Sequence, residues 1–323
     1  MTADKLRLWV QAVSFVLLTY GGRIGIHLGY ALPCFSCPFV GGCGGYCFLM
    51  LLQRVGIFGI GAFDKVFTYI GLKNMLWSVA FIVAALALSK LWCGWICPFG
   101  TVQDMLAGLR RGLGVRESEL SPRVLDLLKP VKYIFLAGIL LLPFLLTAKI
   151  LGGDFSYFFC RICPARIIMP FFTLDNRTVW LDFSNYVNFL VSVTGILAAA
   201  VTVTGSFFKD RFFCLVCPML PLIQICRKLS PWKFEKNAAY CSGCGNCSRV
   251  CPMDIRKVSD AVESGNVMTD ECLLCTRCVC SCPENEVLAL KFFSRKLLVS
   301  SKAGLIKRLL KKDGRKNVGE RDK

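Results

Sequence analysis

The stretch C-G-W-I-C-P-F-G (residues 93–100) decides how the rest of the sequence is interpreted. It follows directly on an apolar run (residues 77–91), and its two cysteines lie four positions apart with a proline after the second. Thiolates bind zinc and iron–sulfur clusters, and such centres usually take four protein ligands. This stretch supplies two thiolates. A centre here therefore requires two further cysteines from elsewhere in the chain.

The composition excludes an ordinary soluble domain and a disulfide-stabilised one. The 323 residues are 55% hydrophobic, with a mean hydropathy of +0.56, and twenty cysteines accompany a single histidine, His27. Disulfide scaffolds are typically short secreted chains, so metal-bound thiolates are the leading interpretation. One histidine excludes a haem held by two histidines of this chain, and no C-x-x-C-H sequence occurs. We therefore expect no haem.

Four segments are apolar enough, and long enough, to cross a hydrocarbon core of about 30 Å. The first has a basic start but no small-residue cleavage site, which indicates an anchor rather than a signal peptide. A further apolar segment, residues 48–72, is interrupted by Arg54, Asp64 and Lys65, and we predict an interfacial or re-entrant helix there. The four predicted spans are residues 8–28, 75–92, 133–151 and 186–208.

The distribution of Lys and Arg predicts the orientation. With the N-terminus inside, the inner segments (1–8, 99–132 and 207–236) hold 14 of these residues, and the outer segments (27–75 and 152–185) hold 6. The positive-inside rule then places both termini in the cytoplasm of a multi-pass protein of the cell (inner) membrane. The net charge of +18 lies mostly beside apolar segments and in the C-terminal tail. This pattern favours membrane lipid over nucleic acid as a partner.

A cysteine pair followed by proline occurs four times, each time near a predicted span. The first cysteine of a pair recurs after 126 residues, from Cys34 to Cys160, and after 121 residues, from Cys93 to Cys214. We therefore predict a tandem duplication, residues 1–115 and 130–235, within a membrane domain of residues 1–236. The four pairs are Cys34/Cys37, Cys93/Cys97, Cys160/Cys163 and Cys214/Cys217.

Two spans per repeat give both halves the same orientation, related by an axis along the membrane normal. The corresponding cysteine pairs of the two repeats then lie close together, and two such pairs supply the four thiolates of a [4Fe–4S] cluster. The proline is expected to end a helix and leave backbone N–H groups for the cluster sulfurs. The predicted inner set is Cys93, Cys97, Cys214 and Cys217, and the predicted outer set is Cys34, Cys37, Cys160 and Cys163.

Alternatives remain open for these two sets. Buried cysteines pack like small hydrophobic residues, and four thiolates also suit zinc. The outer set is compatible with disulfides as well. It also has two further candidates, Cys43 and Cys47, which are able to replace one of its pairs.

The C-terminal region carries the most specific pattern, two consecutive C-x2-C-x2-C-x3-C-P runs. This is the bacterial two-cluster ferredoxin pattern, in which the fourth cysteine of each run binds the other cluster. We predict a small α+β domain at residues 237–290. Cys280, within it, and Cys226, before it, are not expected to be cluster ligands. Cluster A takes Cys241, Cys244, Cys247 and Cys282, and cluster B takes Cys272, Cys275, Cys278 and Cys251.

The tail, residues 291–323, carries twelve Lys or Arg against three acidic residues, with apolar residues interspersed. We expect an amphipathic helix lying on anionic lipid, with a solvated tail as the alternative. The predicted fold class is therefore mainly α. It comprises a four-transmembrane-helix bundle built from a tandem duplication and a small α+β two-cluster ferredoxin domain.

The motifs resemble those of a known family. C-F-S-C-P (34–38), C-G-W-I-C-P-F-G-T-V-Q-D (93–104), C-R-I-C-P-A (160–165) and R-F-F-C-L-V-C-P (211–218), followed by a two-cluster ferredoxin run, resemble the NapH/NosR-type membrane polyferredoxins. The resemblance implies four helices, [4Fe–4S] clusters, and electron transfer between a quinol pool or cytoplasmic donor and a partner across or beside the membrane. NosR-like members also carry a flavin domain. We expect no flavin in this chain, and instead a quinol-linked, flavin-bearing or haem-bearing partner subunit.

No residues suggest acid–base or nucleophilic catalysis, since the chain has one histidine and no Walker A or G-x-G-x-x-G loop. The cofactors would carry the chemistry. The leading hypothesis is an iron–sulfur electron-transfer component of an oxidoreductase system, with two to four [4Fe–4S] clusters and no catalytic residues. One alternative is a copper-type metal-ion reductase that uses the outer cysteines. The other is a non-catalytic protein for assembly or sensing of iron–sulfur clusters or zinc.

Overall fold

The computed structural model describes residues 3–28, 42–54, 67–118, 121–173 and 181–306. The chain divides into two compact units. The helical unit is Val10–Lys228, and the sheet unit consists of Met1–Trp9 and Leu229–Lys323. Each unit has its own packing and is described separately.

Three helices of the described residues are long and apolar enough to cross a membrane, namely α3 (Tyr69–Leu88), α5 (Pro122–Thr147) and α8 (Tyr186–Phe208). The Thr68 side chain caps α3 by accepting a bond from the Gly71 N–H at 3.2 Å. Ser121 caps α5 in the same way, and Pro122 occupies the first helical position. The bounds of α8 are those predicted, and α3 and α5 begin earlier than the predicted spans. The apolar helices support a membrane protein.

The first two apolar segments differ from prediction. A single span was predicted at residues 8–28, but α1 (Ala3–Tyr20) is followed by a short 3-10 turn, η1 (Gly21–Ile24). α1 is not among the three candidate spans, since its 18 residues include Asp4, Lys5 and Arg7. In the expected re-entrant segment, α2 (Phe48–Leu52) is one short helix, residues 55–66 lie outside the described parts, and Tyr69 already belongs to α3. The four-span bundle therefore stays a prediction.

Short elements carry the cysteine pairs of the helical unit. Pro98 and Pro164 occupy the first turns of α4 (Pro98–Gly112) and α7 (Pro164–Thr173), and Pro218 caps α9 (Met219–Ile225). A short helical turn ends two or three residues before each of these prolines, and a new helix starts there, where the missing N–H of proline costs nothing. The second cysteine of each of these three described pairs therefore lies at a helix N-terminus. The remaining short elements are η4 (Trp92–Ile96, a π-helical turn), η5 (Gly153–Phe155), α6 (Phe158–Arg161), η7 (Phe212–Leu215) and η8 (Cys226–Leu229).

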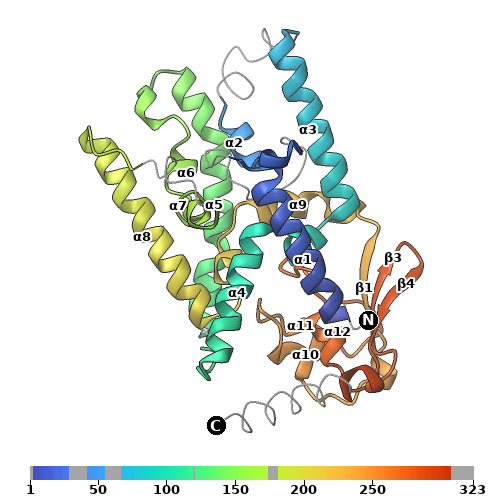
Figure 1. The fold of residues 1–323 in the computed structure, drawn as a ribbon. Coiled ribbons are helices and arrows are strands. Elements are labelled where there is room, and N and C mark those ends of the chain that lie inside the picture. Colours follow the sequence, from blue (N-terminus) through green and yellow to red (C-terminus); the bar gives the residue numbers. More distant parts are fainter. Residues whose placement is uncertain (1–2, 29–41, 55–66, 119–120, 174–180, 307–323) are drawn as a thin grey trace. The chain divides into compact units, whose positions relative to one another are not determined.

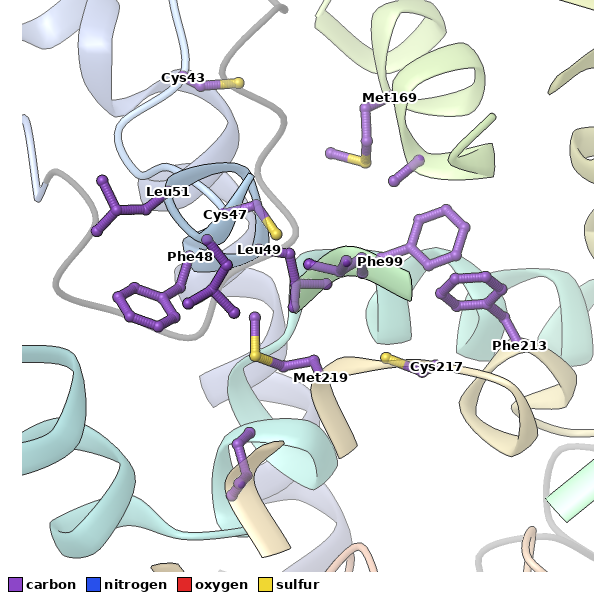
Figure 2. Close-up of a cluster of buried hydrophobic side chains, with 14 of the residues drawn as sticks. Cys43, Cys47, Phe48, Leu49, Leu51, Phe99, Met169, Phe213, Cys217 and Met219 are labelled. Carbon is purple, nitrogen blue, oxygen red and sulfur yellow. The ribbon is translucent and has the colours of Figure 1, made fainter. Parts of the chain in front are cut away.

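The helices of this unit pack around one apolar core. α4 and α7 each lie against α8, and α5 contacts both α2 and α9 (Figure 1). Within the core, the Phe99 and Phe213 rings meet edge to face with centroids 5.0 Å apart. Figure 2 shows Cys47, Phe99, Phe213 and Cys217 among these buried side chains. Cysteines far apart in the chain thus share a water-poor interior.

The sheet unit is built on four antiparallel strands in the order β2-β1-β3-β4, with β1 (Trp232–Lys236) paired to β2 (Gly265–Asn266) and β3 (Leu288–Phe292). β3 continues through a turn at Phe293, whose φ is 52°, into β4 (Arg295–Val299). This hairpin replaces the start of the amphipathic helix expected from residue 291, because β3 pairs along its whole length with β1. The other elements are η9 (Ala238–Tyr240), α10 (Asn246–Arg249), α11 (Lys257–Asp260) and α12 (Arg277–Ser281).

Candidate metal centres

The helical unit brings the predicted inner cysteines together, although the two pairs are 121 positions apart. The Cys97 and Cys214 thiols act electrostatically on Cys93, and all three act on Cys217. Burial raises the pKa of every member, that of Cys214 to about 12. Cys217 is buried and the other three are half-buried. Four such thiols in mutual range are a suitable donor set for a [4Fe–4S] cluster, and binding it would release their protons.

Backbone N–H groups at helix starts point at two of these sulfurs. The Gly100 N–H donates to the Cys97 Sγ at 3.5 Å, and the N–H groups of Gly100 and Phe99 counteract the rise in the Cys97 pKa. The Met219 N–H does the same for Cys217. Free N–H groups and the helix dipole make a helix N-terminus favourable for negative charge. These N–H groups would therefore stabilise the Cys97 and Cys217 thiolates that a bound cluster requires.

Gln103, which lies ten residues after Cys93, holds the opposite cysteine pair. It is only 2% exposed, and its Oε1 accepts bonds from the Phe213 N–H at 2.9 Å and the Ser206 hydroxyl at 3.2 Å. Its Nε2 donates to the Cys214 Sγ at 3.9 Å. Gln224, which occupies the corresponding position after Cys214, has a different role, since its Oε1 accepts a bond from the Tyr133 hydroxyl.

Arg211 supplies a buried positive charge beside the same cysteines. Its guanidinium, 1% exposed, donates to both carboxylate oxygens of Asp104, at 3.1 and 2.7 Å, and to the backbone carbonyls of Cys93 and Gly94. Gly100 permits this approach, because a Cβ there would lie 3.0 Å from the Arg211 Nη1. Sequence reasoning did not assign a role to Arg211; its position directly before F-F-C was the available signal. The Lys90 charge, also fully buried, acts on Cys93.

A second ion-pair network joins α4 to the end of α8. The buried Arg110 pairs with Asp210 at 2.8 Å and with Glu117 at 3.2 Å, and it donates to the Phe208 carbonyl at 2.8 Å. Arg111 completes the network through Asp210. These pairs fix the helix that carries Gln103 and Asp104 against the segment that leads to Cys214.

The sheet unit places the eight cysteines predicted as ligands around two small cavities. The first cavity is lined by the four cysteines predicted for cluster A, and the second by the four predicted for cluster B. Cys247 lines both cavities. Lys236 lies at the first cavity and donates to the carbonyls of Ser259 and Ala261 at 2.9 and 2.8 Å. The first cavity is lined by Cys241, Cys244, Cys247 and Cys282, and the second by Cys251, Cys272, Cys275 and Cys278.

The predicted outer set is only partly described. Cys160 and Cys163 lie close together, as the effect of Cys163 on the Cys160 thiol indicates. Cys34 and Cys37 lie outside the described residues, so their predicted meeting with Cys160 and Cys163 is untested. Cys47 instead lines the same cavity as Cys160 and Cys163.

The donor sets match what a cubane needs. Among the parts of the chain that the structure describes, no three His, Cys, Asp or Glu side chains converge tightly enough to hold a single metal ion. A [4Fe–4S] cluster differs from a single ion because each of its four irons takes one thiolate. The four-cysteine groups and the N–H groups aimed at sulfurs of the inner set fit this requirement.

Comparison with known proteins identifies the family. A 4Fe-4S binding domain matches residues 70–116 and again residues 191–237, and a 4Fe-4S dicluster domain matches residues 233–283. The chain is 34% identical over 212 residues to YccM of Escherichia coli (strain K12), whose name provisionally describes an electron transport protein. It is 23% identical over 195 residues to the ferredoxin-type protein NapH of the same organism, and 28% identical over 207 residues to the regulatory protein NosR of Pseudomonas aeruginosa.

Together these matches support a polyferredoxin of the NapH/NosR type. The similarity to YccM covers 65% of this polyferredoxin and 53% of YccM, about half that relative's length. For NapH the shares are 57% and 67%, and for NosR 63% and 25%. No solved structure matches the polyferredoxin. The domain matches establish [4Fe–4S] clusters as its cofactors and confirm the resemblance inferred from its motifs.

Proposed function

We propose that this polyferredoxin is a membrane-bound electron-transfer protein with clusters at three sites. These are the inner set (Cys93, Cys97, Cys214 and Cys217) and the predicted sets A and B. A bound [4Fe–4S] cluster supplies reversible one-electron reduction. The observation that carries the proposal is the gathering of three separate groups of four cysteines, one in the helical unit and two in the sheet unit.

The protein's own residues would set the properties of the inner site. Buried thiols keep water away, and the N–H groups of Phe99, Gly100 and Met219 favour negative sulfur. Arg211 and Lys90 place positive charge near Cys93, which favours the more reduced, more negative state. Such surroundings tune a potential rather than catalyse a bond change.

We also infer a four-span membrane domain that arose by tandem duplication. The two matches to one family domain begin 121 residues apart, the same offset as from Cys93 to Cys214. The Lys and Arg distribution favours both termini in the cytoplasm, in the cell (inner) membrane, with the basic tail against lipid. The partners we propose are redox proteins, quinol-linked or bearing flavin or haem. The similarity to YccM supports this role in electron transport.

Metal analysis of protein purified without oxygen tests the proposal. Three clusters correspond to about twelve irons per chain, and the sheet unit alone accounts for about eight. We expect this iron content or more, no stoichiometric zinc, and EPR signals that appear on reduction and vanish on reoxidation. Zinc in place of iron, or clusters that do not reduce reversibly, would contradict electron transfer and favour a role in assembly or sensing.

Serine variants test the inner ligand set. Cys93→Ser and Cys214→Ser should each remove about four irons and the same EPR signal, because their thiolates share one cluster. Cys226→Ser serves as the matched control in the same unit and should retain all iron. Loss of two different signals from Cys93→Ser and Cys214→Ser would refute their pairing.

A further inference from the structure

The helical unit contains a second group of cysteines whose sequence pattern and supporting contacts match those of the inner site. The segment that ends at Gln53, C-G-G-Y-C-F-L-M-L-L-Q, aligns without gaps with C-G-W-I-C-P-F-G-T-V-Q, which ends at Gln103. Both have cysteines at the first and fifth positions, glycine at the second and glutamine at the eleventh. The first segment begins at Cys43, and its second cysteine is Cys47. The two segments differ at the position of Pro98, where Phe48 stands.

The opposite cysteine pairs are also alike. Y-F-F-C-R-I-C-P (157–164) and R-F-F-C-L-V-C-P (211–218) share the same F-F-C-x-x-C-P core. The residue before each phenylalanine pair adopts a left-handed conformation, with φ of 55° at Tyr157 and 56° at Arg211. Positive φ is uncommon for residues other than glycine, so its recurrence at matching positions indicates one shared backbone geometry.

Gln53 makes the contacts that Gln103 makes. Its Oε1 accepts a bond from the Phe159 N–H at 3.2 Å, and its Nε2 donates to the Cys160 Sγ at 3.0 Å. Gln103 binds the Phe213 N–H and the Cys214 Sγ in the same way. Each glutamine also donates to the carbonyl four residues before it, that of Leu49 or that of Phe99, and each is 2% exposed.

The surroundings of this second group of cysteines suit a metal cluster. Cys47, Cys160 and Cys163 line an apolar cavity of about 400 Å³. Cys43, 3% exposed, and Cys47 belong to one cluster of buried hydrophobic side chains (Figure 2), and Cys163 packs against this cluster. The buried Arg166 acts on both Cys160 and Cys163, as Arg211 does on the inner cysteines. Backbone N–H groups after Pro164 are directed at the Cys163 sulfur.

We propose that Cys43, Cys47, Cys160 and Cys163 bind a further [4Fe–4S] cluster, with Gln53 as the positioning residue for Cys160. The proposal rests on the proposed function, because the inner site is its template. It removes Cys34 and Cys37 from the outer ligand set predicted from the cysteine–proline spacing. Neither family domain extends over any of the four cysteines.

The same cavity places this cluster beside the inner site. Its wall includes Phe213, Val216 and Pro218, the immediate neighbours of Cys214 and Cys217. The two cysteine groups of the helical unit are therefore separated by apolar protein of this one core. An electron arriving at the inner site would have an acceptor of the same chemical class within the same unit.

Iron analysis and EPR of full-length variants purified without oxygen test the proposal. Wild-type protein should contain about sixteen irons, corresponding to four clusters. Cys47→Ser and Cys160→Ser should each lose about four irons and one common signal, distinct from the signal removed by Cys93→Ser. The double variant Cys34→Ser/Cys37→Ser is the matched control and should retain all iron.

The outcomes separate this proposal from the proposed function. Iron loss in Cys34→Ser/Cys37→Ser, or full iron in Cys43→Ser and Cys47→Ser, would overturn the ligand set while leaving the inner cluster intact. Failure of the proposed function would appear instead as full iron in Cys93→Ser. If Cys47→Ser protein does not accumulate, the double variant still decides, because the proposal requires that its iron content be unchanged.

Gln53 is tested by a change that preserves its size. Gln53→Glu removes the amide donor to Cys160, so the midpoint potential and EPR line shape of the further cluster should shift while its iron stays. Gln103→Glu should shift only the signal that Cys93→Ser removes. A Gln53→Glu protein with an unaltered spectrum and potential would overturn the positioning role.

Discussion

The inner site of the helical unit and the two sites of the sheet unit gather cysteines by different means. All eight predicted ligand cysteines of the sheet unit come from residues 241–282, within turns and short helices of a few residues. The inner site draws on two pairs 121 positions apart and relies on Gln103 and Arg211 to hold the backbone around them. One arrangement is local in sequence, and the other depends on long-range packing.

The difference lies in where the supporting interactions come from. In the sheet unit, close spacing brings the ligands together with few additional side chains, and Cys244 remains exposed. In the helical unit, buried polar side chains bridge segments that do not adjoin in the chain. We therefore expect the helical unit to be more sensitive to changes in residues that are not ligands. The following variants test this expectation.

Replacing Arg211 should have the largest effect. Arg211→Leu removes the buried ion pair with Asp104, which is 9% exposed, and removing one partner of such a pair costs about 3–5 kcal/mol. We expect a lower melting temperature in detergent and loss of the inner EPR signal. Arg211→Lys should recover part of both, since it keeps the charge but not the two-pronged geometry.

The control for Arg211 is Lys129→Ala, which removes an exposed pair with Asp126 and should change stability by at most about 1 kcal/mol. If both variants melt at the wild-type temperature, the buried pair does not support the inner site, and the contrast between the units fails.

Replacing Gln103 should have an intermediate effect. Gln103→Leu removes the acceptor of the Phe213 N–H in the core, and losing a buried hydrogen-bond partner costs about 1–3 kcal/mol. The midpoint potential of the inner cluster should shift as well. Gln224→Leu is the matched control, because Gln224 occupies the corresponding position after Cys214 but bonds to Tyr133. A larger effect at Gln224 would contradict the role given to Gln103.

The smallest effect is expected on the surface of the sheet unit. Lys296→Ala removes an exposed ion pair with Glu286, 3.2 Å long, at the β3–β4 hairpin. Such pairs contribute about 0–1 kcal/mol, so melting and the signals of clusters A and B should stay close to wild type. A large drop in stability would show that the sheet unit also depends on side chains remote from its cysteines.

Several features were accessible from local pattern alone. The bounds of α8 follow from an uninterrupted apolar run. The cysteines that line the two cavities of the sheet unit follow from the double C-x2-C-x2-C-x3-C run. The first predicted span was less accurate, since α1 begins among three charged residues before residue 8 and ends where Gly21 and Gly22 begin a 3-10 turn. The helix expected from residue 291 gave way to a hairpin because β1, more than fifty residues earlier, supplies its partner strand.

The sequence by itself determined the cofactor class and the apolar helices, since ligand spacing and span length are constraints that act over short stretches of chain. Only the tertiary structure decided which side chains surround the cysteines of the helical unit. Gln53 reaches Cys160 across 107 positions, and Arg211 reaches Cys93 across 118. Contacts at such separations form only when helices pack, so no local pattern contains them. The same packing places Cys47 at the cavity that Cys160 and Cys163 also line.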